Sequence, residues 1–211
     1  MVSAMVAGRS KEVEEKAHMK FTVMAAGLAA CVMMTSANVA VAQMDFRNTV
    51  TGEALDIQGE APQEGRDTPA VKKFLETGIN PYTEVKGCLP KGEQVYLESC
   101  SGCHGHVGEG KVGPGLNDSY WTYPANTTDK GLFETIFGGA QGMMGPHGGH
   151  LELDDHLKLL AWIRHFQVDD VKEAEWLTDE QKKAFKPFKS EEWEKTGRAA
   201  AQKEQCAISG N

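Results

Sequence analysis

The sequence of 211 residues contains only five cysteines, no excess of positive charge and no alternation of apolar and polar residues over any useful length. So few cysteines, odd in number, exclude a fold built on disulfides. The 22 Lys and Arg stand against 30 Asp and Glu, so the chain lacks the basic footprint that nucleic-acid binding requires. Charged residues make up 25% of the chain, which excludes a polytopic membrane protein. The missing period of two predicts an all-α protein.

The N-terminal 42 residues have the order of features of a secretory signal. Met19-Lys20 precedes the apolar run Phe21–Met34, and the small residues Ala40-Val41-Ala42 follow. The run is shorter than the roughly 20 apolar residues of a spanning helix, so we expect no stable membrane insertion. We predict cleavage after Ala42, and residues 1–18 indicate an upstream start codon chosen in error.

Leu28-Ala-Ala-Cys31 offers an alternative, because it is similar to a lipoprotein cleavage box that would tether the chain through Cys31. The residues after Cys31 stay apolar, whereas a tether would be polar. In both cases the protein leaves the cytoplasm for an oxidising compartment. Removing residues 1–42 leaves 18 basic and 27 acidic residues, a net charge of −9.

The exported chain divides into an arm, a helical region and a charged tail. Residues 43–87 are rich in Gly, Pro, Thr and carboxylates and form an arm. The tail, residues 168–211, carries four aromatic residues that need a surface to pack on, namely Trp176, Phe185, Phe188 and Trp193. Apolar spacing and capping signals predict helices over 69–76, 90–103, 129–137, 152–166, 178–185 and 190–205.

The segment Cys100-Ser101-Gly102-Cys103-His104 has the pattern of c-type haem attachment. Residues three apart at the end of a helix share a face, so both sulfurs can reach the two vinyl groups along one haem edge. His104 then becomes the proximal iron ligand. Half a zinc site would need a second Cys/His pair at metal spacing, and a thioredoxin-like pair would need a βαβ context, which is absent here.

A sixth ligand has to come from the other side of the haem. Cleavage of the leader leaves Met44 at the new terminus and the pair Met143-Met144 in a glycine-rich loop, residues 138–149. We predict Met144 as the distal ligand, with Met143 as the alternative. The competing imidazoles are His106, His147 and His150, and the Met pair could also simply fill space in the core. A thioether ligand closes the sixth position and raises the reduction potential, which favours one-electron transfer over oxygen chemistry.

Further residues are candidates for the surroundings of the haem. The segment Gly113-Pro114-Gly115-Leu116 could supply the carbonyl that orients His104. Trp121 and Tyr123 could donate hydrogen bonds to the haem propionates, or could be plain core residues.

Taken together, these residues resemble a class I cytochrome c. The matching pattern is Gly92-x-x-Val95-Tyr96, the haem motif, Gly113-Pro114, the Met loop and Leu160-Ala-Trp-Ile-Arg164, and it covers about residues 88–167. The resemblance implies three to five helices around one covalent haem. It also implies a crossing of the first and last helices that brings Tyr96 against Trp162, with Gly92 permitting the close approach.

A narrower resemblance is to the cytochrome c(L) family, the periplasmic electron acceptors of quinoprotein methanol dehydrogenase in methylotrophic bacteria. It rests on the stretches 100–106, 120–124, 138–146, 176–184 and 48–53. The resemblance implies that electrons pass singly from pyrroloquinoline quinone (PQQ) to this haem and on to a smaller cytochrome c. It implies a periplasmic monomer, a calcium ion near the propionates, for which the sequence indicates no ligands, and a disulfide that tethers the C-terminal extension. Cys88 and Cys206 are the cysteines that remain for that disulfide.

We therefore expect an electron-transfer protein, not an enzyme. The acidic surface suits docking on a basic patch. Two alternatives remain at this point: a general carrier for another periplasmic dehydrogenase, and a haem enzyme or gas sensor with an open sixth site.

Overall fold

The computed structural model describes residues 44–208, so the predicted leader, its cleavage site and the possible anchor at Cys31 lie outside the described residues. All regular elements of the described part are helical, as predicted, and one isolated bridge joins Arg47 to Ala54. The elements are α2 (Ile57–Glu60), α3 (Pro69–Thr77), η1 (Lys86–Cys88), α4 (Leu89–Ser99), α5 (Ser101–His104), η2 (Pro124–Thr127), α6 (Asp129–Gly138), α7 (Leu153–His165), α8 (Asp179–Ala184), α9 (Ser190–Glu192), η3 (Trp193–Gly197) and α10 (Arg198–Ala201).

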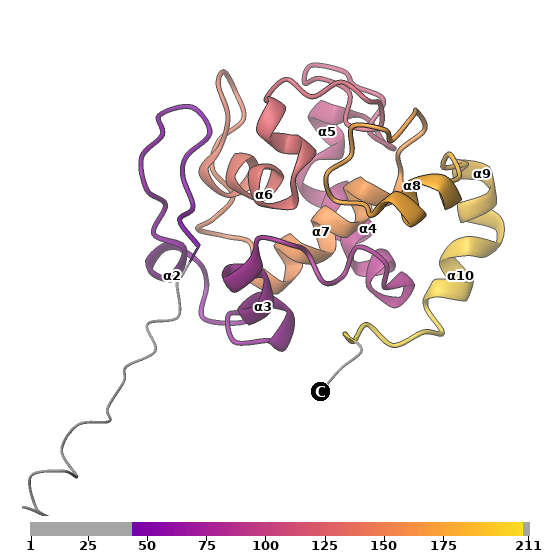
Figure 1. The fold of residues 1–211 in the computed structure, drawn as a ribbon, viewed down its shortest axis with the longest axis horizontal. Helices are drawn as coiled ribbons and strands as arrows, with labels where there is room; N and C mark the ends of the chain where they lie inside the picture. The colour runs from indigo at the N-terminus through magenta and orange to yellow at the C-terminus, as the bar shows by residue number, and fades with distance from the viewer. Residues whose placement is uncertain (1–43, 209–211) are drawn as a thin grey trace, which may run out of the picture. The chain divides into compact units, whose positions relative to one another are not determined.

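Helices α4 and α7 cross at the centre of this part of the chain, as Figure 1 shows. Gly92 lies at the crossing, where a Cβ atom would overlap the carbonyl of Lys158 and come within 2.9 Å of Trp162 Cβ. The expected close approach at Gly92 is thus confirmed. The ring of Phe166 lies edge-on between the two expected neighbours, with its centroid 5.1 Å from that of Tyr96 and 5.8 Å from that of Trp162. Phe166 directly follows the last residue of α7, and its backbone N–H still donates to the carbonyl of Trp162.

Helices α3 and α6 complete the core against α7. Phe46 of the arm, Phe74 of α3 and Phe133 of α6 form a cluster with ring centroids 5.0–5.6 Å apart. Thr128 caps α6 by accepting a hydrogen bond from the backbone N–H of Gly131. This cap begins the helix next to the loop that contains Trp121 and Tyr123.

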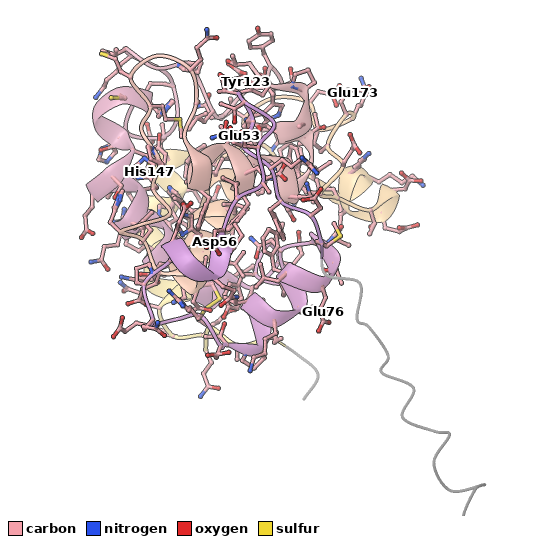
Figure 2. The ribbon with its side chains drawn as sticks, turned by 90° about the vertical axis from the view of Figure 1, so that its left-hand side faces the viewer. Glu53, Asp56, Glu76, Tyr123, His147 and Glu173 are labelled. Atoms are coloured by element: carbon pink, nitrogen blue, oxygen red, sulfur yellow. A yellow bond between two sulfur atoms is a disulfide. The ribbon has the colours of Figure 1, made fainter. Side chains whose placement is uncertain are left out.

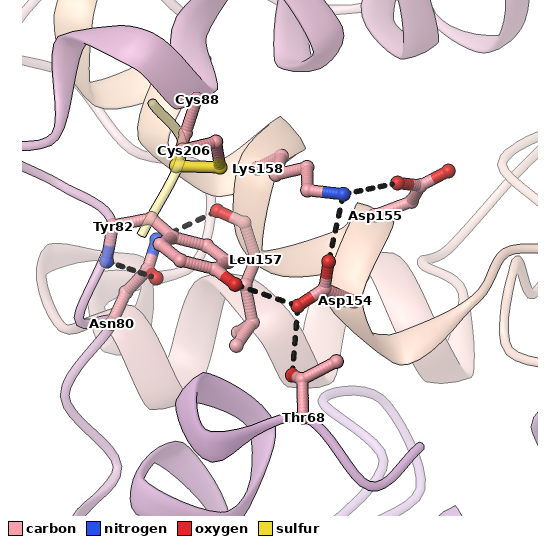
Figure 3. Close-up of a disulfide and its surroundings, with 9 residues drawn as sticks. All are labelled: Thr68, Asn80, Tyr82, Cys88, Asp154, Asp155, Leu157, Lys158 and Cys206. Atoms are coloured by element: carbon pink, nitrogen blue, oxygen red, sulfur yellow. Dashed lines mark hydrogen bonds and ion pairs between the residues drawn. A yellow bond between two sulfur atoms is a disulfide. The ribbon is translucent and has the colours of Figure 1, made fainter. Parts of the chain in front are cut away.

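The arm is tied to the N-terminal end of α7 by one carboxylate (Figure 3). Asp154 accepts hydrogen bonds from the hydroxyls of Thr68 and Tyr82, both at 2.8 Å, and pairs with Lys158 at 2.7 Å. Three partners satisfy a carboxylate that is largely buried, which offsets its desolvation. The arm is therefore fixed to the helical core.

The C-terminal tail packs along α4 and α7 and ends in a disulfide. The predicted bond between Cys88 and Cys206 is confirmed (Figure 3). Arg198 of α10 makes a bidentate pair with Glu93 of α4, at 2.6 and 2.7 Å. Trp193 is 7% exposed and packs on Trp162, with ring centroids 5.0 Å apart.

Three of the four aromatic residues of the tail pack against side chains of α7, as predicted. Besides Trp193, Phe188 packs edge-on against Trp162, and Trp176 covers the guanidinium of Arg164 at 3.7 Å. Phe185 is only half-buried and lies outside the core cluster.

Two predicted helices differ from the observed ones. The helix predicted over 90–103 is interrupted at Cys100, where φ is −121°, and resumes as α5. The helix predicted over 190–205 ends at Ala201 and contains the wider turn η3. The first difference lies at the first cysteine of the haem motif. The second lies a few residues before Cys206, which the disulfide joins to Cys88.

Candidate functional site

The interruption at Cys100 shapes the first wall of a cavity. Helix α4 ends at Ser99, and α5 carries Cys103 and His104 into the wall that Cys100 begins. The thiols of Cys100 and Cys103 both line this wall, which agrees with the prediction that residues three apart share one face. Burial, followed by the nearby Cys103, raises the pKa of the Cys100 thiol to about 12. A redox-active dithiol has a lowered thiol pKa, so the direction of this shift is opposite to the one that a thioredoxin-like site needs.

His104 is held in one orientation by the loop that follows it. Its Nδ1 lies 2.8 Å from the carbonyl oxygen of Pro114, in the segment where the sequence suggested such a carbonyl. A carbonyl can only accept, so Nδ1 carries the proton and Nε2 keeps a free lone pair. At Gly113 a Cβ atom would come within 2.7 Å of the imidazole, so the glycine leaves room for the ring. His104 therefore has the tautomer and the bracing of a metal-ligating histidine.

The loop after α6 forms the opposite wall and carries the two methionines. The N–H of Ala140 donates to the carbonyl of Met144 at 2.9 Å, which closes a small turn within the loop. Gly139, with φ of 80°, provides the left-handed backbone that leads into this turn. Met143 is 82% exposed, whereas Met144 is partly buried and packs against the core. Both line the cavity, but only Met144 is held in place by surrounding side chains.

The competing histidines are placed differently. His147 and His150 line the cavity and lie against each other, with Nδ1 and Nε2 3.1 Å apart. Burial, followed by the neighbouring His150, lowers the pKa of His147, so its neutral form is favoured. His106 does not belong to the lining of the cavity.

Trp121 and Tyr123 both lie in the cavity wall. The hydroxyl of Tyr123 accepts a hydrogen bond from the backbone N–H of Gln141 at 3.0 Å, which ties the Met loop to the preceding loop. Its own proton stays available for another acceptor. Trp121 is 9% exposed and packs against the guanidinium of Arg164, 5.1 Å from its ring centre. Trp121 thus combines a core contact with a place in the wall.

The cavity has a volume of about 640 Å³, a size typical of sites for a sizeable organic ligand. Among the described residues that line it, none is Asp, Glu, Lys or Arg. Exposed acidic residues such as Glu53, Asp56 and Glu173 lie elsewhere on the surface (Figure 2). Two sulfurs and a braced imidazole on one wall, with a thioether on the other, fit a flat iron macrocycle.

Asn126 and Thr135 also line the cavity, and the sequence gave no reason to select them. Both are neutral polar residues, Asn126 in the short η2 turn and Thr135 within α6. Only the fold brings them to the same wall.

Within residues 44–208 no three His, Cys, Asp or Glu side chains gather in a way that could hold a metal ion. No helix in this range has the length and apolar character needed to cross a bilayer.

Comparison with known proteins places this site in context. The family model described as cytochrome C oxidase, cbb3-type, subunit III matches residues 89–163. Cytochrome c-L of Methylorubrum extorquens is 63% identical over 147 residues, 70% of this chain and 74% of that protein. The crystal structure of cytochrome cL from Hyphomicrobium denitrificans shares 77% identity over 80% of this chain and 100% of that chain, with a TM-score of 0.77. That of cytochrome cL from Methylophaga aminisulfidivorans shares 49% identity over 70% of this chain and 97% of that chain, with a TM-score of 0.67.

Proposed function

The chain belongs to the cytochrome c-L family of c-type electron carriers, and from this premise we propose that it accepts single electrons from PQQ-dependent methanol dehydrogenase. It passes them to a smaller cytochrome c in the periplasm. The observation that carries the proposal is the cavity that joins Cys100, Cys103 and His104 on one wall with Met144 on the other. Membership of this family implies covalent haem c, which supplies an iron that cycles between two oxidation states.

The residues of the haem motif hold the group. Cys100 and Cys103 form the two thioether bonds, which fix one haem edge to the chain. His104 offers Nε2 to the iron, because its Nδ1 proton is held by the Pro114 carbonyl at 2.8 Å. That hydrogen bond keeps the ring from rotating and makes the imidazole a stronger donor.

Met144 is the distal ligand. Its partial burial and its contacts with the core hold its side chain in place, whereas Met143 is 82% exposed and can be immobilised only at an entropic cost. A filled sixth position leaves no vacant site for oxygen or peroxide, so the protein carries electrons and is not an enzyme.

Trp121 and Tyr123 remain the candidate donors to the haem propionates. The Tyr123 hydroxyl accepts from the backbone N–H of Gln141, so its own proton can be donated to a propionate. The calcium ion expected near the propionates has no assigned ligands. Metal analysis of the purified protein before and after chelation tests that expectation.

The proposed function is tested by mixing oxidised, haem-loaded protein with methanol-reduced methanol dehydrogenase at low and high salt, and following the visible spectrum. We expect fast reduction that slows with salt, because the net charge of −9 on residues 43–211 steers the carrier to a basic docking face. A protein that dithionite reduces but methanol dehydrogenase does not would be a general carrier for another donor. Tight binding of carbon monoxide by the reduced protein would instead indicate an open sixth site.

A further inference from the structure

The Met loop, residues 138–149, begins and ends at the C-terminus of α6. The last carbonyl groups of a helix have no hydrogen-bond partner within the helix. Here the carbonyl of Ile136 accepts from the backbone N–H of His147 at 3.1 Å, and that of Phe137 accepts from Gly148 at 3.0 Å. The end of α6 therefore holds the part of the loop that returns to it.

The part of the loop that leaves α6 is held by the N-terminal arm. The carbonyl of Gly138, the last residue of α6, accepts a hydrogen bond from Asn48 Nδ2 at 2.9 Å. A Cβ atom at Gly138 would come within 2.9 Å of the same nitrogen and within 3.0 Å of Leu55, so the arm lies directly against this backbone. In Figure 1 the turn of the arm lies beside the loop that follows α6. Asn48 thus satisfies the end of a helix 90 positions further along the chain.

The amide group of Asn48 is oriented by its own turn. Its Oδ1 accepts from the backbone N–H groups of Val50 and Thr51, at 2.9 and 3.0 Å. An N–H group needs an acceptor, so these two contacts assign the oxygen and leave Nδ2 as the atom that faces α6. Beside it, the hydroxyls of Thr49 and Thr135 lie 2.8 Å apart and join the same turn to α6 a second time. The arm therefore holds α6 close to the point where the Met loop departs.

Only two residues carry this hold to the backbone of Met144. Gly139 follows Gly138 directly with φ of 80°, and a Cβ atom there would lie 3.0 Å from the carbonyl oxygen of Met144. The N–H of Ala140 donates to that same carbonyl at 2.9 Å. A displacement of the Gly138 peptide group would therefore reach Met144 through direct contacts.

We propose that Asn48 is a positioning residue for the distal haem ligand: its hydrogen bond to the Gly138 carbonyl fixes the start of the Met loop, and the loop keeps the Met144 thioether at the iron. The inference rests on the haem and the distal ligand proposed above. Six of the twelve loop residues are glycine, so the loop gains its rigidity from contacts at its ends. Asn48 does not belong to the lining of the cavity and acts through the backbone of the loop.

Asn48→Asp tests the hydrogen bond, because Asp has the same shape and keeps the oxygen that accepts from Val50 and Thr51. Its second oxygen cannot donate to the carbonyl of Gly138. The measured quantity is the affinity of the ferric, haem-loaded protein for added imidazole at about pH 8, since imidazole binds the iron only after Met144 has left it. The dissociation constant should fall about fivefold, the effect expected of one lost hydrogen bond.

Amide hydrogen exchange of the reduced protein gives a second readout that needs no added ligand. The amide proton of Ala140, which bonds to the Met144 carbonyl, should exchange about fivefold faster in Asn48→Asp. The amide proton of Phe166, which bonds to the Trp162 carbonyl at the end of α7, should exchange at the parent rate. A loss of overall stability would instead accelerate both protons.

Two further variants separate the hydrogen bond from other effects of the substitution. Asn48→Ala removes the donor without adding a charge, and it should also bind imidazole about fivefold more tightly than the parent. The matched control is Thr51→Val in the same turn, because the Thr51 side chain bonds only to the exposed Glu53 and its backbone N–H is kept. Thr51→Val should keep the parent affinity.

Parent-like imidazole affinity and Ala140 exchange in folded, haem-loaded Asn48→Asp would overturn the inference. So would a tighter affinity in Asn48→Asp but not in Asn48→Ala, because the added charge would then be the cause. Failure of the proposed function gives a different result, since the unmodified protein would then lack covalent haem, or Met144→Ala would keep low-spin iron. If Asn48→Ala does not fold, Asn48→Asp and Thr51→Val together still decide the question.

Discussion

Breaking the disulfide between Cys88 and Cys206 should lower the free energy of unfolding substantially. Cys88 is fully buried where η1 meets α4, and Cys206 lies beyond the end of α10, in the exposed final segment of the tail. The two residues are 118 positions apart, so the bond closes a loop that contains helices α4 to α10 and, within them, the haem motif. The unfolded chain loses most freedom when such a long loop is closed.

The loop length sets the size of the effect. The chain-entropy model gives about 4–5 kcal/mol for a loop of this length, and measured losses on removing a native disulfide are about 2–5 kcal/mol. The folded tail should stay in place without the bond, because Trp193 remains packed on Trp162 and Arg198 remains paired with Glu93. The loss therefore comes mainly from the unfolded state.

The assay is urea denaturation of haem-loaded Cys88→Ala/Cys206→Ala, followed by the helical circular-dichroism signal. Alanine suits the buried position of Cys88, where a serine hydroxyl would lack a partner. Unmodified protein treated with a thiol reductant provides the control, since reduction opens the disulfide and leaves thioether bonds intact. The reduced protein should unfold like the variant, and the reductant should not change the variant. Equal free energies of unfolding for variant and oxidised parent, within about 0.5 kcal/mol, would refute the reasoning.

Three further predictions concern the core, the distal ligand and pH. Gly92→Ala should cost about 1–3 kcal/mol in urea denaturation, because a Cβ there overlaps the backbone of α7, whereas Gly149→Ala, which meets open space, should cost far less. Met144→Ala should give high-spin iron that binds carbon monoxide, and Met143→Ala should keep the low-spin spectrum; the opposite pattern would make Met143 the ligand. Burial lowers the pKa of His156 to about 4 from an ordinary 6.5, so the unfolded state binds the proton more readily, and stability should fall by roughly 3 kcal/mol as the pH drops from about 6.5 to 4. Urea midpoints of the parent and of His156→Gln across that range check this, since the variant should lose less stability in acid.

Local chemistry explains how much of this protein the sequence could predict. The haem motif at 100–104 is short and contiguous, and the thioether spacing needs no information from elsewhere in the chain. Capping and apolar periodicity located α3, α6 and α7 to within about two residues, because both signals act within a few turns of helix. The family resemblance then supplied the disulfide partner of Cys88, which spacing alone could not specify.

Tertiary contacts decided the rest. Met143 and Met144 are neighbours of identical chemistry, and only the fold distinguishes them, since Met143 is exposed and Met144 packs against the core. The proposal of Met144 as the distal ligand rests on that difference. Tyr96 of α4 packs edge-on against Phe166 at the end of α7, a contact between distant segments that the pattern of apolar residues does not encode.

By itself the sequence determined the helical class, the chemistry of the haem motif and the acidic character of the chain, because each depends on residue type and short-range spacing. The tertiary structure alone decided that Asn126, Thr135 and Thr49 form one hydrogen-bonded chain into the cavity. These three neutral residues come from an arm, a turn and a helix, 86 positions apart at the widest. Hydrogen bonds between distant segments form only after the apolar core has brought the segments together, so they leave no periodic trace in the sequence.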